Sequence, residues 1–439
     1  MATTRSFLAE SAVKIGRAPW RAVAWIVVLA AVARVAAVAA TADLRTTEYE
    51  YGYIANSLLA GHGYSWAWDG MDRQPTSLFP PGYVAWVAVF RGLFGGDHVA
   101  MYVVQALVAA TGCLPAFLLG RLVWGPLAGL GFALGYAIYP ELVLVPSVAV
   151  PEFVHVILAL WMLVVCFDGL ARAGPGVWWR RALALGGLAG AAILVRESAA
   201  LVAFACGLRW MLSAWSGRSD LARAAALAGL ASVVIVAPWT VRNWIVQGEF
   251  IPVRTGYGYN LWLGNHPGAT GTNWGVDGRY MIDTVDPEYR RDLLARLPSD
   301  EQDRDRAYRD EIRQVVRDDP WRYARLTFDR LRYLLWFDPT YPLGSHPLYR
   351  AGYLLLLATA LPGIVIAARA RRFDTAFWWI VVGHLVLYVP VMVVPRYRLL
   401  TNTLLLLFSA VWLVRVSGGE PDPASLESAA PGLQPGRGA

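Results

Sequence analysis

The chain has 439 residues, of which 56% are apolar and 16% are charged, and its formal net charge is +7. A mean hydropathy of +0.42 excludes an ordinary soluble domain and is typical of a protein with several membrane-spanning helices. The basic excess fits cytoplasmic loops that face anionic lipid, and the absence of a basic stripe with interleaved aromatic residues argues against a nucleic-acid partner.

Ten apolar segments predict membrane-spanning helices, so the fold class that we expect is an all-α polytopic membrane protein. They lie at about 20–40, 99–121, 124–144, 153–170, 182–198, 199–215, 223–240, 350–368, 375–394 and 399–416. A further apolar segment, Pro80–Gly95, is short for a span, and counting it would raise the number to eleven.

The placement of basic residues favours an interfacial or re-entrant helix at Pro80–Gly95. With that assignment every short basic loop faces the cytoplasm, as the positive-inside rule requires. These loops carry Lys14, Arg17, Arg21, Arg121, Arg172, Arg180, Arg181, Arg218, Arg223, Arg369, Arg371 and Arg372. The N-terminus, residues 1–19, and the tail, residues 417–439, are then cytoplasmic, and the composition of the tail predicts disorder.

Two large polar segments face outward in this topology. The first outer loop, 41–98, interrupts a transmembrane core that extends over 20–240, and an extracytoplasmic loop, 241–349, precedes C-terminal transmembrane helices at 350–416. The charged part of the second loop has apolar residues at helical spacing and is divided by Pro320. We therefore expect two amphipathic helices there, of a kind that lies on a membrane surface.

The first outer loop opens with an acidic, tyrosine-rich motif, TTEYEYGYIANSLLAGHGY at Thr46–Tyr64. Helical spacing predicts a short helix on the bilayer from four of its residues: Tyr51, Ile54, Ala55 and Leu58. A carboxylate of Glu48 or Glu50 at such an interface is suited to act as a general base. The structural alternative is an acidic cap on the N-terminus of the helix.

Two further acidic positions lie at the predicted outer ends of spans. Glu152 follows two prolines and opens the fourth span, where it serves either as a second catalytic acid or as a helix N-terminal charge. Glu141 is a weaker candidate. Arg196 and Glu197 form an adjacent pair near the outer end of the fifth span, for which structural pairing and function are both open.

Four of the arginines on the outside are candidates for ligand binding: Arg242, Arg254, Arg396 and Arg398. The last two occupy a short loop, PRYR, and so depart from the positive-inside rule that the other short loops obey. A guanidinium group binds phosphate oxygens in a fork, so an anionic ligand at the outer face would explain them. Contact with lipid headgroups is the alternative.

The six histidines are scattered without metal-ligand spacing, and the three cysteines fall inside apolar segments. We therefore assign no metal site and no cofactor, with a divalent cation left open.

The order of motifs resembles one family. The motifs are YIANSLLAGHGYS, PTSLFPPGY, PELVLVPSVAVPE, APWTVRNWIVQGEFIPVRTGYGYNLWLGNHPGATGT and PRYR. Together they resemble the GT-C superfamily of polytopic glycosyltransferases, in the branch of protein O-mannosyltransferases and lipid A aminoarabinose transferases, over roughly Trp20 to Val416.

The resemblance implies a reaction and its partners. Members of the family transfer a sugar from a polyprenyl-phosphate carrier to a hydroxyl acceptor, with inversion, at the outer face of the membrane. For this chain it implies a multi-pass protein of the bacterial inner membrane, with a lipid, a glycan or a protein as the acceptor.

The resemblance also suggests roles for residues. It places the catalytic carboxylate in the first outer loop, with Glu48 favoured over Glu50, and Glu152 as the second acidic residue. It further implies a group of substrate-binding residues: Tyr51, His62, Arg242, Asn243, Arg254, Asn265, His266, Arg396 and Arg398.

The sequence departs from the family pattern in two places. Thr47 stands where relatives carry aspartate, four residues before Tyr51, so Glu48, Glu50 or Asp43 must take that role or the chain is a non-catalytic member used in envelope assembly. The lysine that some relatives carry before the paired prolines is missing, which leaves phosphate binding to arginine, backbone or tyrosine donors. A transporter or flippase for a lipid-linked sugar is the other alternative, although the chain shows none of the internal repeats common in transporters.

Overall fold

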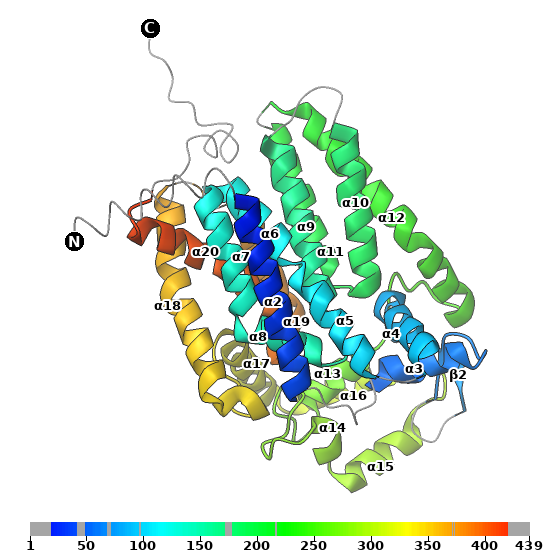
Figure 1. Cartoon of the computed structure of the whole chain (residues 1–439). Coiled ribbons are helices and arrows are strands. Elements are labelled where there is room, and N and C mark those ends of the chain that lie inside the picture. The colour runs from blue at the N-terminus through cyan, green and yellow to red at the C-terminus, as the bar shows by residue number, and fades with distance from the viewer. Residues whose placement is uncertain are drawn as a thin grey trace.

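The computed structural model describes residues 19–41, 49–67, 72–95, 98–171, 178–215, 217–370, 372 and 374–419. Long helices run side by side through the molecule, and shorter helices gather at one end of them (Figure 1). The described residues contain a single two-stranded sheet, in which β1 (Ser65–Trp66) pairs antiparallel with β2 (Gln74–Pro75). The protein is an all-α polytopic membrane protein, as the composition predicts.

The helices of the bundle come from both halves of the chain. They are α2 (Pro19–Thr41), α5 (His98–Ala110), α6 (Cys113–Trp124), α7 (Pro126–Ile138), α8 (Pro140–Leu144), η1 (Val145–Ser147), α9 (Glu152–Ala171), α10 (Trp178–Val195), α11 (Ala199–Trp215), α12 (Ser219–Gln247), α18 (Pro347–Arg369), α19 (Thr375–Tyr388), η3 (Pro395–Arg398) and α20 (Leu399–Val416). Every segment predicted to span the membrane is helical over most of its length.

The predicted count of about ten spans is not confirmed. By length and composition, six helices of the described residues could cross a membrane, or seven if the bent pair from Pro126 to Ser147 is one span. The pair bends by 57° at Pro140, which cannot donate the hydrogen bond that would continue α7. The apolar helices α11 and α19 are shorter than a bilayer requires, with 17 and 14 residues.

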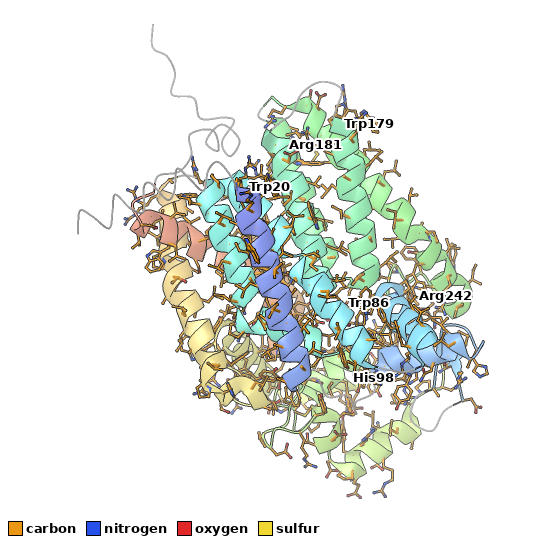
Figure 2. The ribbon with its side chains drawn as sticks, viewed as in Figure 1. Trp20, Trp86, His98, Trp179, Arg181 and Arg242 are labelled. Carbon is orange, nitrogen blue, oxygen red and sulfur yellow. The ribbon has the colours of Figure 1, made fainter. Side chains whose placement is uncertain are left out.

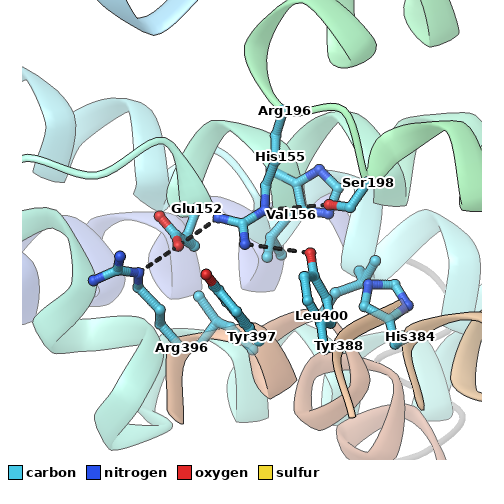
Figure 3. A pocket seen from close by; sticks show the side chains of 11 residues that line it. Glu152, His155, Val156, Arg196, Ser198, His384, Tyr388, Arg396, Tyr397 and Leu400 are labelled. Carbon is cyan, nitrogen blue, oxygen red and sulfur yellow. Dashed lines mark hydrogen bonds and ion pairs between the residues drawn. The ribbon is translucent and has the colours of Figure 1, made fainter. Parts of the chain in front are cut away.

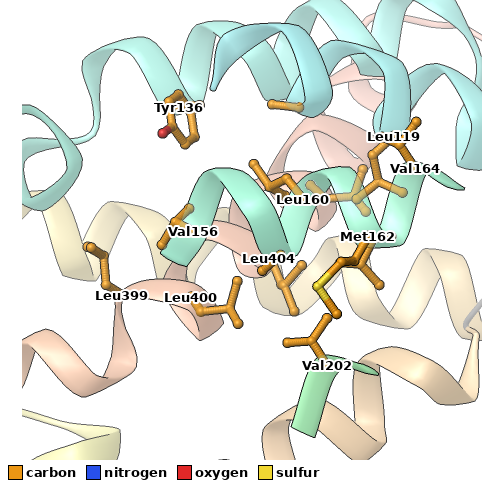
Figure 4. Packing of buried hydrophobic residues seen from close by; sticks show 14 of the residues in the cluster. Leu119, Tyr136, Val156, Leu160, Met162, Val164, Val202, Leu399, Leu400 and Leu404 are labelled. Carbon is orange, nitrogen blue, oxygen red and sulfur yellow. The ribbon is translucent and has the colours of Figure 1, made fainter. Parts of the chain in front are cut away.

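One hydrophobic core joins these helices. Leucine and valine side chains of α9 meet those of α6, α11 and α20 (Figure 4). Glycine allows the closest approach: a Cβ atom added at Gly363 of α18 would lie 1.9 Å from the carbonyl oxygen of Phe408 on α20. Small residues at helix contacts are typical of membrane proteins, because backbones there pack directly against each other.

A buried arginine stabilises the bend between α7 and α8. Arg34 of α2 has no exposed surface and donates hydrogen bonds to the carbonyl oxygens of Tyr136 and Ala137, at 2.9 and 3.1 Å. These carbonyls lie at the end of α7, where the helix offers them no partner of its own. The guanidinium group therefore meets the negative end of a helix dipole rather than a carboxylate.

The first outer loop forms two packed helices, α3 (Tyr49–Leu59) and α4 (Pro81–Phe94). The predicted interfacial helix is α4, which has 14 residues and does not count among the candidate spans. Figure 2 places Trp86 of α4 near His98 and Arg242, at the end of the bundle opposite Trp179 and Arg181.

The second outer segment has its own small core. It contains α13 (Tyr257–Asn265), α14 (Met281–Thr284), α15 (Pro287–Arg296), α16 (Glu301–Asp318), α17 (Pro320–Leu335) and η2 (Pro342–Ser345). Two amphipathic helices meet at Pro320, as predicted. The apolar residues of α16 pack with the turn that follows α19, through Val391, Met392 and Val394. A buried carboxylate joins α16 to the first outer loop, because Glu301 accepts hydrogen bonds from Thr76, Ser77 and Thr255.

Two predicted boundaries differ from the structure. The seventh span does not break at Pro238, because α12 continues through this proline to Gln247 and ends at Gly248 in the left-handed region. The returning chain supports this extension, since Asn243 donates hydrogen bonds to the carbonyls of Ile251 and Val253. The ninth span, predicted to reach residue 394, ends at Tyr388, and the following residues form turns.

Candidate active site

Helix ends and short links bring several charged side chains together. Glu152 opens α9 directly after Pro151, a residue that favours the start of a helix. Arg196 lies in the short link between α10 and α11, and Arg396 lies in the short helix η3. Figure 3 shows these three side chains around one small cavity, with Tyr388 from the end of α19 facing them.

The carboxylate of Glu152 is the centre of the cluster. Its Oε1 atom accepts a hydrogen bond from an Nη of Arg196 at 2.5 Å and forms an ion pair with the Nε of Arg396 at 2.9 Å. Glu152 is buried, and its Oε2 atom has no hydrogen-bond partner among the described residues. A buried carboxylate oxygen without a donor is costly, so this atom is available to a hydroxyl group from a ligand or water.

Arg196 is held entirely by the protein. Besides Glu152, its Nε donates to the hydroxyl of Ser198 at 3.2 Å and an Nη to the hydroxyl of Tyr388 at 3.3 Å. The guanidinium group also lies over the ring of Tyr397, 5.0 Å from its centre. Arg196 therefore orients Glu152 and lends positive charge, but has little hydrogen-bonding capacity left for a ligand.

Arg396 differs from Arg196 because only its Nε is engaged. Its two terminal amino groups make no hydrogen bond or ion pair within the described residues, and they point away from Glu152 (Figure 3). The side chain is 43% exposed. A guanidinium group oriented by one carboxylate, with both Nη atoms free, is suited to bind an anionic oxygen in a fork.

A second ion pair lies next to the first. Arg254, in the loop after α12, pairs with Glu197 at 3.4 Å, and its guanidinium lies 5.0 Å from the centre of the Phe79 ring. Tyr51 of α3 packs against the same ring, at 4.6 Å between centres. Burial raises the pKa of the Tyr51 hydroxyl, and the charge of Glu152 raises it further, while the arginines oppose this effect. The hydroxyl thus stays protonated and can donate to an anion.

The cavity continues past the charged groups. It is small, with a cavity volume of about 10 Å³, and Val156, Leu399, Leu400 and two histidines line it, His155 of α9 and His384 of α19 (Figure 3). No group of three or more acidic, histidine or cysteine side chains that could hold a metal ion occurs in the part of the chain that the structure describes. The cavity therefore combines positive charge at the helix ends with neutral and apolar walls.

Comparison with known proteins gives one partial family match and several structures of similar fold. The family model for dolichyl-phosphate-mannose-protein mannosyltransferases matches residues 79–241. No curated protein matches the chain. The oligosaccharyltransferase AglB from Archaeoglobus fulgidus, solved with an inhibitory peptide and a dolichol-phosphate, matches with a TM-score of 0.54 and 15% identity over 90% of this chain. The chain therefore shares the fold of this solved oligosaccharyltransferase.

Other solved structures complete the comparison. The apo form of the Archaeoglobus fulgidus oligosaccharyltransferase matches with a TM-score of 0.56 and 14% identity over 94% of this chain. The present chain covers 50% and 54% of the two archaeal chains, so it spans about half their length. ArnT from Cupriavidus metallidurans, bound to undecaprenyl phosphate, has a TM-score of 0.43 at 15% identity, over 90% of this chain and 78% of its own, and such a score does not by itself establish a shared fold.

The predicted catalytic carboxylates lie only partly within the described residues. Glu48, Thr47 and Asp43 lie outside them. Glu50 lies in the first turn of α3, directly before Tyr51. The third predicted catalytic residue, Glu152, is the centre of the cluster.

Arg242 and Asn243 engage the protein rather than the cavity. Arg242 donates to the backbone carbonyls of Tyr64 and Thr76, at 2.9 and 2.6 Å. Asn243 has no exposed surface. Their contacts join α12 to the first outer loop. His62 lies on the surface, between Gly61 and Gly63, in the turn after α3.

Arg398, which was also predicted to bind substrate, makes its contacts within the protein. Arg398 is buried and donates to a carboxylate oxygen of Glu141 at 3.0 Å and to the hydroxyl of Tyr349 at 2.5 Å. It lies away from the cavity that Arg396 lines. The two arginines of PRYR therefore serve different partners.

Asn265 and His266 are buried in the outer segment. Asn265 donates to the carbonyl of Val391 at 3.0 Å and accepts from Arg330 at 3.0 Å. His266 packs between aromatic rings, and burial lowers its pKa to about 4. Neither residue lines the cavity around Glu152.

The sequence did not predict the pairing of Arg196. Arg196 and Glu197 are adjacent but bind different partners, Glu152 and Arg254, because consecutive side chains diverge at the end of a helix. Tyr388, Tyr397 and Ser198 were missed, since tyrosine and serine near a span end carry no distinctive spacing signal. The available hint was that PELVLVPSVAVPE and PRYR, which supply Glu152 and Arg396, both occur among the motifs that carry the family resemblance.

Proposed function

We propose that this protein is a membrane glycosyltransferase that moves a sugar from a polyprenyl-phosphate carrier to a hydroxyl acceptor. The acceptor is a lipid, a glycan or a protein, and the reaction takes place at the outer face of the bacterial inner membrane. The observation that carries the proposal is the free fork of Arg396 beside Glu152, with two more guanidinium groups from Arg196 and Arg254 close by.

Arg396 is assigned to the carrier phosphate. Its free Nη atoms would donate to two phosphate oxygens, and the hydroxyl of Tyr51 would donate to a third. Arg196 and Arg254 remain bound to their carboxylates and add positive charge. Such donors stabilise the negative charge that develops on the phosphate as it departs.

A carboxylate of the first outer loop is assigned as the general base, with Glu48 favoured and Glu50 next. It takes the proton of the acceptor hydroxyl while the acceptor oxygen forms a bond to the anomeric carbon of the sugar. The bond from that carbon to the phosphate oxygen breaks, and the polyprenyl phosphate leaves with the electron pair. Attack opposite the leaving group inverts the anomeric carbon.

Glu152 is assigned to orient the arginines and a hydroxyl group of a substrate. Its Oε1 atom fixes Arg196 and Arg396, and its free Oε2 atom accepts from a hydroxyl group of the sugar or the acceptor. A positioned acceptor of this kind lowers the entropic part of the barrier.

Purified protein in lipid nanodiscs, supplied with a radiolabelled polyprenyl-phosphate sugar and a membrane extract as acceptor, tests the proposal. Release of polyprenyl phosphate with label moving to the acceptor supports transfer. Donor moved across vesicle membranes without cleavage would show a flippase instead. Donor binding with neither cleavage nor movement would show a non-catalytic member of the family.

A further inference from the structure

Helix α17 exposes apolar side chains and buries a charged one, which is the reverse of what a helix surrounded by water does. One face is exposed and carries large apolar side chains, with Trp321 80%, Phe328 65% and Leu335 50% exposed. These residues follow one another at seven-residue intervals, so they lie on one side of the helix. The opposite face contains Arg330, which has no exposed surface.

The buried face of α17 is fixed by hydrogen bonds. Arg330 donates to the carbonyl of Val391 at 2.5 Å and to the side chain of Asn265 at 3.0 Å. The hydroxyl of Tyr323 donates to the carbonyl of Pro390 at 3.1 Å. The helix is therefore held in this orientation, and its aromatic face is not free to turn inward.

The exposed face also carries positive charge in the middle of its aromatic residues. Arg325 lies between Trp321 and Phe328 on the same side of the helix and makes no hydrogen bond or ion pair with another described residue. Tryptophan and arginine on one apolar face are typical of a helix at the headgroup level of a bilayer, where rings enter the apolar boundary and guanidinium groups reach phosphate.

The same face continues into a helix that faces lipid. The hydroxyl of Tyr353 on α18 donates to the carbonyl of Leu335 at 2.9 Å, which joins the end of α17 to the first turns of a candidate span. Figure 1 shows α17 beside the lower end of α18. On α18 most of the large apolar side chains that are exposed are leucines, among them Leu348 at 70% and Leu355 at 66%.

We propose that the exposed face of α17, formed by Trp321, Arg325, Phe328 and Leu335, is seated on the outer leaflet of the bilayer, with Arg325 bound to phosphate groups of phospholipid headgroups. The buried face of α17 holds Pro390 and Val391, a few residues before Arg396. Seating α17 therefore also sets the depth of Arg396 relative to the membrane surface. Only this last consequence rests on the proposed function.

Spin labels at three equally exposed positions of the full chain test the proposal. Phe328→Cys reports on the aromatic face, Leu355→Cys gives the lipid reference on α18, and Arg313→Cys gives the water reference on α16, where the side chain is 65% exposed. The native cysteines, Cys113, Cys166 and Cys206, are buried, and labelled wild type gives the background. The protein is reconstituted in phosphatidylcholine–phosphatidylglycerol vesicles, and collision of each label with oxygen and with a water-soluble nickel complex is measured by electron paramagnetic resonance.

We expect the label at 328 to favour oxygen over nickel, as at 355, and the label at 313 to favour nickel. A label at 328 that behaves as at 313 would overturn the proposal, and so would a label immobilised by a protein partner. Arg325→Glu places a negative charge against the headgroups and should shift the label at 328 toward nickel. Arg325→Gln replaces it if the charge reversal prevents folding, and an unchanged ratio in the folded variant would refute the headgroup contact.

Discussion

The two arginines of PRYR allow the clearest test, because the structure assigns them opposite contacts. In Arg396→Ala the protein loses one ion pair, from Nε to Glu152, and Glu152 keeps Arg196 at 2.5 Å. We therefore expect little change in the melting temperature. If the free Nη atoms bind the carrier phosphate, the variant loses charge-assisted hydrogen bonds that contribute about 1.5–3 kcal/mol, which corresponds to a loss of donor affinity of roughly ten- to a hundredfold.

Arg398→Ala is the matched control, two residues away. It removes the arginine partner of Glu141, whose other contact in the cluster is the amide of Asn402 at 2.7 Å. Breaking a buried pair on one side typically costs about 3–5 kcal/mol, so this variant should melt at a lower temperature. Donor titrations and melting curves in the same detergent separate the two effects. Unchanged donor affinity in Arg396→Ala would refute the phosphate assignment, and an equally stable Arg398→Ala with weakened donor binding would show that the arginines had been assigned the wrong way round.

Three other predictions concern the base, the outer segment and the bundle. Glu48→Gln should lower turnover by at least about a hundredfold, with Glu50→Gln as the second choice, and full turnover in the double variant would end the assignment of the base to this motif. Burial lowers the pKa of His266 from 6.5 to about 4, so the folded state binds fewer protons and stability should fall as the pH drops from 6.5 toward 4. Melting curves at several pH values should show a smaller loss in His266→Gln, and an equal loss would contradict this account. Gly363→Ala should lower the melting temperature because its Cβ meets a carbonyl oxygen of α20, whereas Gly187→Ala, with nothing within 4 Å, should not; equal melting temperatures would argue against the close contact of α18 and α20.

Hydrophobicity predicted the helices because it acts over long segments. Each predicted span averages its signal over about twenty residues, and local exceptions do not remove it. The number of crossings depends on breaks and lengths that a hydropathy average does not register. The bend at Pro140 and the early end of α19 at Tyr388 are such features, and both depend on where backbone groups find hydrogen-bond partners. Arg34 donates to the carbonyls just before Pro140, and Arg330 donates to carbonyls just after Tyr388.

The candidate site was less predictable because charge pairing depends on contacts between distant segments. The sequence singled out Glu152, Arg254 and Arg396 as outer charges, and the structure brings all three near Tyr51. Whether a polar side chain at a helix end contacts a ligand or the protein depends on how deeply that side chain is buried, and a single sequence does not show this burial. Asn243 and Asn265 therefore looked like ligand groups, although their amides bind backbone carbonyls.

The two acidic motif ends and the two late arginines form one arrangement. PELVLVPSVAVPE has Glu141 of α8 as its second residue and Glu152 of α9 as its last, and PRYR pairs one arginine with each, Arg398 with Glu141 and Arg396 with Glu152. The short helix η3 makes this possible, because side chains two positions apart on a 3₁₀ turn point to different sides. The pair of Arg398 and Glu141 is closed, because Tyr349 and the amide of Asn402 complete its hydrogen bonds. The pair of Arg396 and Glu152 is open: it borders the cavity with free nitrogen atoms on the arginine and a free oxygen on the carboxylate. The closed pair fixes the position of η3, and this fixed position also places Arg396 beside Glu152.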